Sequence, residues 1–297
     1  MTRALLEALR PWQWLKNLIV FAALIFGMRA GDLDAVALAS AAFVVFCLLA
    51  SAGYLLNDLR DLALDRAHPD KARRPIASGA LPVRVAAVTA VVFAVLGLAL
   101  AVAITAHDAP LPGRFYVLAA AYLGLSVAYS TFLKHAFLVD VLTITVGFLL
   151  RVAGGGAVLG VEISSWLLVC TFFLACFLGL GKRRGELARL ETDTANRTRP
   201  VLAEYRVEVL DVLVAVAAAA LLVCYVLYTV SARTVEEFGT RDLFWTIPFA
   251  FYGIGRFLAL SMRPAGAEDP ALLFWRDRPL QVAFVLWALT TAGIIYA

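Results

Sequence analysis

The stretch Asn57–Gly79, NDLRDLALDRAHPDKARRPIASG, places three aspartates and a cluster of bases beside long apolar runs. Asp58, Asp61 and Asp65 stand at i, i+3 and i+7, so on a helix all three project from one face. Three carboxylates placed in this way repel one another unless a cation lies between them. Oxygen ligands without His or Cys favour Mg²⁺. The stretch therefore predicts a catalytic Mg²⁺ site with these three aspartates as its ligands.

Bases follow the aspartates at once. Protein-bound Mg²⁺ is usually shared with substrate phosphates, and Lys71, Arg73 and Arg74 are placed to hold such phosphates. The alternative is a solvated loop whose acids and bases neutralise one another. Ionisable residues at a membrane are costly, however, and are usually functional. In a membrane protein we therefore favour the binding of a phosphorylated substrate.

The composition indicates a membrane protein. Hydrophobic residues make up 62% of the chain, charged residues 16%, and the mean hydropathy is +0.85. Such an apolar composition is far from that of soluble domains. Several runs have the length of a transmembrane helix, about 20 residues. We predict an all-α, polytopic protein, a single integral-membrane domain over residues 1–297, with nine spans at about 12–29, 35–56, 83–106, 114–132, 137–160, 164–181, 207–231, 242–261 and 279–296.

The basic residues predict the orientation. If the N-terminus is cytoplasmic, nearly all of the 26 Lys and Arg residues lie on the cytoplasmic side; the exceptions are Arg29, Arg114, Arg233 and Arg241 outside and Arg151 within a span. By the positive-inside rule this asymmetry is decisive. We expect a multi-pass protein of the cell (inner) membrane whose active site faces the cytoplasm. Membrane lipids and a phosphorylated substrate are the expected partners, and nucleic acid is not; an oligomer is compatible with the sequence.

A second group of charges, KRRGE at Lys182–Glu186, directly follows the sixth predicted span. Lys182 and Glu186 stand at i and i+4, on one face of a helix that continues from the membrane. Cations beside a carboxylate are suited to binding an anionic substrate. Lys182 and Arg183 would then bind phosphates, and Glu186 would orient these two cations or join the metal shell. The alternative is ordinary anchoring of a helix end by positive charge.

A third group comprises Tyr129, Lys134 and Arg151. Tyr129 and Lys134 bound a polar loop, whereas Arg151 lies well inside the fifth apolar run. An arginine there is expensive unless it meets an anion or a watery cavity, so its partner is expected from another span or from a ligand. The nearby glycines Gly154–Gly156 are interpreted as allowing close helix packing or a bend.

These motifs resemble the UbiA-type intramembrane prenyltransferase superfamily. The resemblance rests on Asn57-Asp58-x-x-Asp61-x-x-x-Asp65, on Arg74-Pro75 with Ser78-Gly79, and on Tyr129 with Lys134, and it extends from Arg10 to the last span. It implies nine transmembrane helices around a central cavity open to the cytoplasmic side.

The sequence departs from that family at one motif. Members that prenylate an aromatic ring carry a second aspartate motif after the sixth span, where this chain has KRRGEL. With RPWQWLKN at 10–17, LRVAGG at 150–155 and WRDRPLQ at 275–281, this is similar to the branch that acts on decaprenyl phosphate. The resemblance implies Mg²⁺-dependent transfer of 5-phosphoribosyl from 5-phosphoribose 1-diphosphate to a polyprenyl phosphate. Pyrophosphate is released, and the product feeds a lipid-linked arabinose donor for cell-wall arabinan.

On this interpretation Asp58, Asp61 and Asp65 bind Mg²⁺, and Lys16 and Asn17 lie at the lip where a lipid phosphate enters. The predicted substrate-binding residues are Lys16, Asn17, Asn57, Lys71, Arg73, Arg74, Tyr129, Lys134, Arg151, Lys182, Arg183 and Glu186. One alternative is an aromatic prenyltransferase of the 4-hydroxybenzoate type, with Glu186 and Glu191 replacing the second motif. The other is a lipid or solute transporter, against which the lack of an internal repeat weighs.

Overall fold

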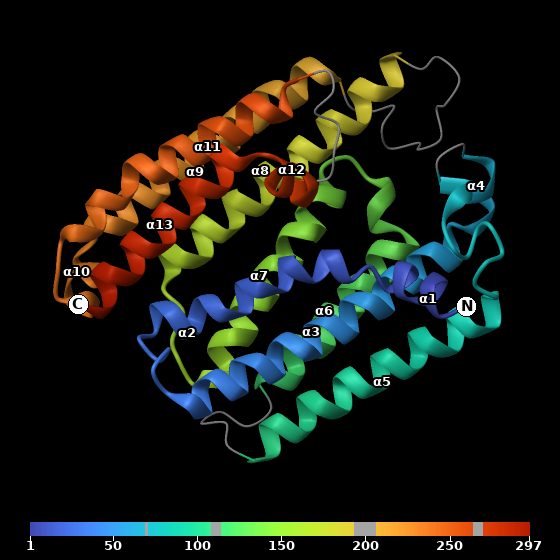
Figure 1. Ribbon diagram of the computed structural model, residues 1–297, viewed down its shortest axis with the longest axis horizontal. Coiled ribbons are helices and arrows are strands. Elements are labelled where there is room, and N and C mark those ends of the chain that lie inside the picture. The colour runs from blue at the N-terminus through green and yellow to red at the C-terminus, as the bar shows by residue number, and fades with distance from the viewer. Residues whose placement is uncertain (69–70, 108–113, 193–205, 264–269) are drawn as a thin grey trace. The chain divides into compact units, whose positions relative to one another are not determined.

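The computed structural model describes residues 1–68, 71–107, 114–192, 206–263 and 270–297 (Figure 1). Every regular element in these ranges is a helix, which confirms the all-α prediction. The chain divides into two compact units, Met1–Ile163 and Ser164–Ala297. A single transferase domain over the whole chain stays a prediction.

The first unit begins with a short helix and a long 3₁₀ segment before its principal helices. A 3₁₀ run of 11 residues is unusual, because such helices rarely exceed 3–4 residues. The elements are α1 (Thr2–Leu9), η1 (Pro11–Phe21), α2 (Ala22–Phe26), α3 (Leu33–Arg60), α4 (Leu62–Ala67), η2 (Lys71–Arg73), α5 (Val83–His107), α6 (Arg114–Thr131), η3 (Leu133–His135) and α7 (Val139–Leu159).

The described residues of the second unit form helices. Its elements are α8 (Ser165–Thr192), α9 (Val207–Val230), α10 (Ala232–Phe238), η5 (Asp242–Thr246), α11 (Ile247–Ser261), α12 (Pro270–Arg276) and α13 (Arg278–Tyr296). Within this unit α8 packs against α9, and α11 packs against both α9 and α13.

Seven helical segments of the described chain are long and apolar enough to cross a membrane, which makes the protein multi-pass. They are Leu33–Arg60, Val83–Thr105, Val139–Leu159, Ser165–Ala188, Val207–Val230, Asp242–Ser261 and Arg278–Tyr296. Helices also cover the other two predicted spans, but Pro11–Phe26 is shorter and α6 is not among the seven. The count of nine spans therefore stays a prediction.

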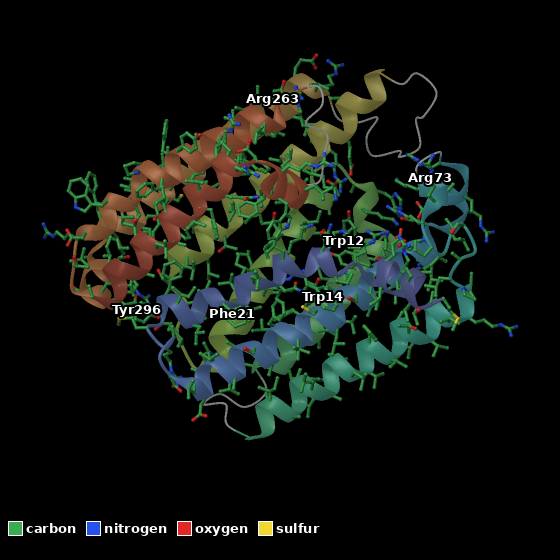
Figure 2. All side chains as sticks on the ribbon, viewed as in Figure 1. Trp12, Trp14, Phe21, Arg73, Arg263 and Tyr296 are labelled. Atoms are coloured by element: carbon green, nitrogen blue, oxygen red, sulfur yellow. The ribbon has the colours of Figure 1, made fainter. Side chains whose placement is uncertain are left out.

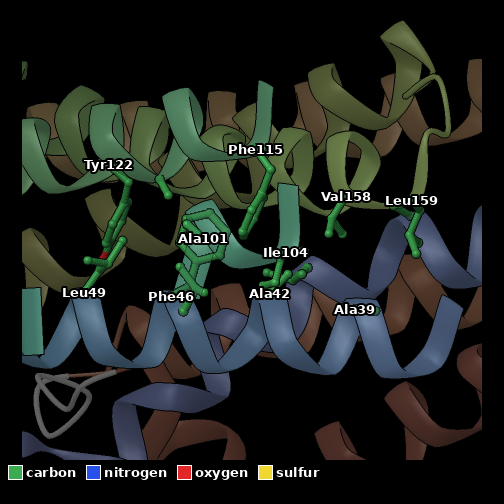
Figure 3. Close-up of a cluster of buried hydrophobic side chains, with 14 of the residues drawn as sticks. Ala39, Ala42, Phe46, Leu49, Ala101, Ile104, Phe115, Tyr122, Val158 and Leu159 are labelled. Atoms are coloured by element: carbon green, nitrogen blue, oxygen red, sulfur yellow. The ribbon is translucent and has the colours of Figure 1, made fainter. Parts of the chain in front are cut away.

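Helix α3 is central to the first unit, where it packs against α5, α6, α7 and η1. In its most apolar window 56% of residues are buried, against 11% for α5, so α5 faces outward. The core that α3 shares with α6 contains Phe46, Phe115 and Tyr122 (Figure 3). The ring of Phe46 meets both other rings edge to face, with centroids 6.0 Å and 5.4 Å away, a favoured arrangement for aromatic pairs.

The N-terminus of α3 is capped by its own sequence. Oδ1 of Asp32 accepts hydrogen bonds from the backbone N–H groups of Asp34 and Ala35, at 3.0 and 3.1 Å. The guanidinium of Arg29 hydrogen-bonds to Asp32 and lowers the pKa of that carboxyl group. These contacts fix where α3 starts, at the end opposite to the aspartates.

Helix α7 and η1 make a backbone contact at Gly155. A Cβ atom at this position would lie 2.2 Å from the carbonyl oxygen of Val20. The prediction that glycines of the 154–156 stretch allow close packing is therefore confirmed, and the neighbour at Gly155 is backbone, which has little room to move.

We expect Gly155→Ala to destabilise the protein by about 1–3 kcal/mol, the usual cost of overpacking a tight contact. Gly124→Ala is the matched control, because Gly124 also lies within a helix and a Cβ atom added there would meet nothing within 4 Å. Unfolding titrations in mixed micelles measure the difference. Equal stability of the two variants would contradict a rigid contact at Gly155.

Candidate functional site

The predicted metal-binding aspartates lie in a cluster of ion pairs. Nη2 of Arg10 lies 2.7 and 2.8 Å from the two oxygens of Asp58. Nη1 of Arg74 lies 3.0 Å from Oδ1 of Asp58 and 2.7 Å from Oδ2 of Asp65, so Arg74 bridges two carboxylates. Both aspartates are buried, so salt screens these pairs less than it screens surface ion pairs. Two cations thus lie against the first and third aspartates of the motif.

The second aspartate pairs with a base from a distant part of the sequence. Nζ of Lys134 lies 2.5 Å from Oδ1 of Asp61 and 3.1 Å from Oδ1 of Asn57. The amide of Asn57 donates in turn to Oδ2 of Asp61 at 3.1 Å. The structure therefore places Lys134 beside the aspartate motif, as expected if both belong to one site. We call Arg10, Asn57, Asp58, Asp61, Asp65, Arg74 and Lys134 the ion-pair cluster.

The backbone around Asp61 explains how the three carboxylates come to lie together. Helix α3 ends at Arg60 and α4 begins at Leu62, yet the N–H of Asp61 donates to Asn57 and the N–H of Asp65 donates to Asp61. The i−4 bonding therefore continues through the break, and with it the helical spacing of the aspartates.

The expectation that these carboxylates converge on one ion differs from the structure. Each carboxylate contacts a Lys or Arg instead, and among the described residues no three His, Cys, Asp or Glu side chains are grouped to hold a metal. The physical reason is that the cations already relieve the mutual repulsion. The donors are still the hard oxygens that suit Mg²⁺, so the set fits that ion by its chemistry, and metal binding by Asp58, Asp61 and Asp65 stays a prediction.

The segment RPWQWLKN lies along α3. Arg10 contacts Asp58, and Nε1 of Trp14 donates to the hydroxyl of Ser51 at 3.0 Å. Asp58 and Ser51 are seven residues apart, on one face of α3. Figure 2 labels Trp14 on this segment and Arg73 on η2. Sequence reasoning quoted this segment for its resemblance but missed Arg10 as a site residue, because nothing local in the sequence connects Arg10 with Asp58.

Arg151 is buried within the first unit, and two of its hydrogen-bond partners, Asn17 and Tyr122, come from other elements. Its Nε donates to Asn17 at 2.7 Å, its Nη2 to the hydroxyl of Tyr122 at 2.7 Å, and its Nη1 to the carbonyl of Gly147 at 2.9 Å. The guanidinium also lies 4.5 Å from the centroid of the Tyr122 ring, a cation–π contact. The prediction of a partner from another span is confirmed. Sequence reasoning missed Tyr122, because only the tertiary fold brings it to Arg151.

Asn17 lies in the interior rather than at an exposed lip. It is fully buried, and its amide both accepts from Arg151 and donates to the sulfur of Cys47 at 3.2 Å. The prediction that Asn17 lies at the lip where a lipid phosphate enters is wrong, because its amide is hydrogen-bonded to the buried guanidinium of Arg151. Its neighbour Lys16 is half-buried.

The remaining candidates of the first unit differ in exposure. Lys71 and Arg73 lie on η2, where Arg73 is exposed and Lys71 is half-buried. The backbone N–H of Lys71 donates to Nδ1 of His68. Tyr129 is half-buried near the end of α6. Their phosphate-binding roles stay predictions.

In the second unit the KRRGE segment forms part of α8, as predicted for a helix that continues from a span. Arg183 is buried, and its Nη1 pairs with Glu186 at 2.5 Å. Nε of Arg184 lies 2.9 Å from Asp211 on α9. Lys182 is half-buried. Glu186 therefore pairs with a cation of its own helix, and its role in orienting the cations or joining the metal shell stays a prediction.

The WRDRPLQ segment builds the turn between α12 and α13. Oδ1 of Asp277 accepts from the N–H of Leu280 and caps α13, while Arg256 pairs with the same carboxylate at 2.8 Å. The Arg256 guanidinium lowers the pKa of Asp277, so this carboxyl stays ionised. The amide of Gln281 donates to the carbonyls of Phe274 and Trp275. These contacts give the motif a structural role.

Comparisons with known proteins agree with the motifs. Residues 18–275 match the UbiA prenyltransferase family. The chain is 36% identical to a decaprenyl-phosphate phosphoribosyltransferase of Mycolicibacterium smegmatis, over 98% of this chain and 92% of that protein. It is 34% identical to the protein of that name from Mycobacterium tuberculosis, over 97% and 93% of the two chains, and 33% identical to that of Corynebacterium glutamicum, over 98% and 86%.

Solved structures show the same fold. A UbiA homolog from Archaeoglobus fulgidus bound to GPP and Mg²⁺ superposes with a TM-score of 0.71 at 20% identity, covering 99% of this chain and 100% of that one. The same homolog bound to DMAPP and Mg²⁺ gives 0.70 at 19% identity, with 99% of each chain covered. A digeranylgeranylglyceryl phosphate synthase gives 0.65 at 15% identity, over 100% of this chain and 99% of the other.

Proposed function

The chain belongs to the UbiA prenyltransferase family, and we propose that it is a decaprenyl-phosphate phosphoribosyltransferase. It transfers the 5-phosphoribosyl group of 5-phosphoribose 1-diphosphate to a polyprenyl phosphate of the decaprenyl type and releases pyrophosphate. The observation that carries the proposal is the similarity of at least 33% identity to three such enzymes over nearly the whole chain. The product, a phosphoribosyl lipid, would feed the synthesis of a lipid-linked arabinose donor for the cell wall.

The ion-pair cluster supports the binding of a highly charged donor. Asp58, Asp61 and Asp65 offer oxygen ligands to Mg²⁺, and Arg74 and Lys134 offer N–H donors to phosphate oxygens once they leave the carboxylates. Exposed Arg73, half-buried Lys71 and Tyr129 are proposed to add contacts to the donor. In the second unit, we assign a phosphate to Lys182, with Arg183 and Glu186 forming the pair beside it.

The reaction is substitution at the anomeric carbon of ribose. Mg²⁺, when bound, would neutralise the charge that develops on the departing pyrophosphate. Arg74 and Lys134 stabilise the same charge as hydrogen-bond donors. The acceptor phosphate is ionised before it attacks, so it needs no side chain as general base. This fits the ion-pair cluster, in which every charged partner is Asp, Lys or Arg.

The lipid substrate also fits the location of the protein. The seven apolar helices keep the chain in the membrane where a polyprenyl phosphate resides. We propose the inner membrane, with the ion-pair cluster on the cytoplasmic side, because soluble 5-phosphoribose 1-diphosphate is supplied there and the basic residues favour that orientation.

A paired transfer assay tests this function. Purified protein with Mg²⁺ receives labelled 5-phosphoribose 1-diphosphate and decaprenyl phosphate in one reaction, and a labelled polyprenyl diphosphate and 4-hydroxybenzoate in the other. We expect the phosphoribose label to enter the lipid phase in the first reaction only, and EDTA to abolish the transfer. Formation of a prenylated aromatic product only in the second reaction would establish prenyl transfer and refute the proposal.

A further inference from the structure

Arg10 contacts both oxygens of Asp58, the first aspartate of the predicted metal site. One nitrogen of its guanidinium contacts both oxygens of that carboxylate, at 2.7 and 2.8 Å. Arg74 contacts Oδ1 as well, at 3.0 Å. The Asp58 side chain is only 3% exposed, whereas that of Arg10 is 22% exposed. A metal ion that bound both oxygens of Asp58 would therefore displace Arg10 from the carboxylate, towards the more open side.

The backbone of Arg10 indicates that this placement is specific. Its φ of 53° and ψ of 58° lie in the left-handed region, where the residue after a helix is commonly Gly or Asn. A long side chain at such a position is strained and persists when the surroundings fix it. Here Asp58 and the ring of Tyr54, 5.2 Å from the guanidinium carbon, supply that restraint.

The charges of the ion-pair cluster balance. Asp58, Asp61 and Asp65 face Arg10, Arg74 and Lys134, so three carboxylates meet three cations. Mg²⁺ alone would give this cluster two surplus positive charges and would leave a displaced guanidinium beside the ion. A diphosphate that arrives with the ion removes the surplus and offers oxygen acceptors to the displaced guanidinium.

We propose that Arg10 is the resting counter-ion of Asp58 and moves to the donor diphosphate when Mg²⁺ takes that carboxylate. Mg²⁺ and diphosphate then bind together, and each binds weakly alone. The inference rests on the proposed function, because it takes the aspartates as the ligands of Mg²⁺. It adds Arg10 to the residues that bind the donor.

Calorimetric titration of the full chain in detergent tests the exchange without measuring activity. The titrants are MgCl₂ alone and MgCl₂ in the presence of inorganic pyrophosphate, with the heat of magnesium pyrophosphate formation subtracted from a protein-free run. Pyrophosphate should tighten Mg²⁺ binding to the unaltered protein by about tenfold or more, within the usual range of site coupling. In Arg10→Gln, Mg²⁺ alone should bind about tenfold more tightly than to the unaltered protein, and the enhancement by pyrophosphate should shrink by a similar factor.

Arg60→Gln is the matched control. Arg60 is exposed in the last turn of α3, so the substitution removes one positive charge two residues from Asp58 and leaves the ion-pair cluster intact. It should bind both titrants as the unaltered protein does. Arg10→Lys keeps a cation but loses the guanidinium, and it should restore part of the coupling.

Unchanged Mg²⁺ affinity and unchanged pyrophosphate enhancement in Arg10→Gln would overturn the inference. If Arg10→Gln does not fold, Arg10→Lys is the deciding variant. Full enhancement of Mg²⁺ binding by pyrophosphate in Arg10→Lys would show that the guanidinium is not needed, and it would overturn the inference. Failure of the proposed function is seen separately, as absent label transfer by the unaltered protein or as Mg²⁺ binding that Asp58→Asn does not reduce.

Discussion

Asp58→Asn is expected to lower the rate of phosphoribosyl transfer by about 10²–10³-fold, the typical cost of losing one group that stabilises charge in a transition state. The amide keeps the size of the carboxylate but loses its negative charge. It also leaves Arg10 and Arg74 beside a neutral group, so Mg²⁺ has one anionic ligand fewer. Transfer of labelled phosphoribose to decaprenyl phosphate, measured at several Mg²⁺ concentrations, gives the size of the loss.

Asp32→Asn is the control for this variant. Asp32 also pairs with an arginine and also lies at an end of α3, but at the opposite end from Asp58. Asn is as good an N-cap as Asp, so the helix start is retained. Near-normal transfer by Asp32→Asn is expected. Near-normal transfer by a folded Asp58→Asn would show that Asp58 is not a ligand of the catalytic metal.

Arg151→Met is expected to lower the free energy of unfolding by about 3 kcal/mol, because a charged group that makes buried hydrogen bonds is lost and its partners remain. Met replaces most of the apolar stem of the side chain. The amide of Asn17 and the hydroxyl of Tyr122 each lose a donor at 2.7 Å. The contact that holds η1 on α7 is thereby weakened. Reversible unfolding in mixed micelles measures the change.

Two comparisons separate this effect from a general loss of charge. Arg84→Gln removes an exposed arginine in the first turn of α5 and should change stability by less than about 0.5 kcal/mol. A double-mutant cycle of Asn17→Ala with Arg151→Met should show coupling of roughly 1 kcal/mol, because the two side chains share a hydrogen bond. Additive effects would mean that the bond contributes little to stability.

The sequence predicted the helices well because apolar length is a local property. A run of about 20 apolar residues crosses a membrane as a helix whatever its neighbours are, since every backbone group must be satisfied within the segment. The weakest prediction was the first span, which is a 3₁₀ segment followed by a short helix that ends at Phe26. Its polar residues Lys16 and Asn17 lower the signal, and the partners of Asn17 lie on other helices.

The site was predicted in part. The spacing of Asp58, Asp61 and Asp65 identified the aspartates, and Arg74 was identified because it follows them in the same charged stretch. Charged residues beside apolar runs are conspicuous in the sequence itself. Arg10 was missed, since its distance of 48 residues from Asp58 carries no local signal.

The sequence by itself determined the class of the protein, its helical spans and the acidic motif, because composition and short-range spacing are properties of neighbouring residues. Only the tertiary structure decided which cations face those acids. Arg10 reaches Asp58 because η1 lies along α3, and Lys134 reaches Asp61 because α6 packs on α3. Long-range ion pairs depend on how helices pack, and packing follows from the shapes of whole faces rather than from the spacing within one segment.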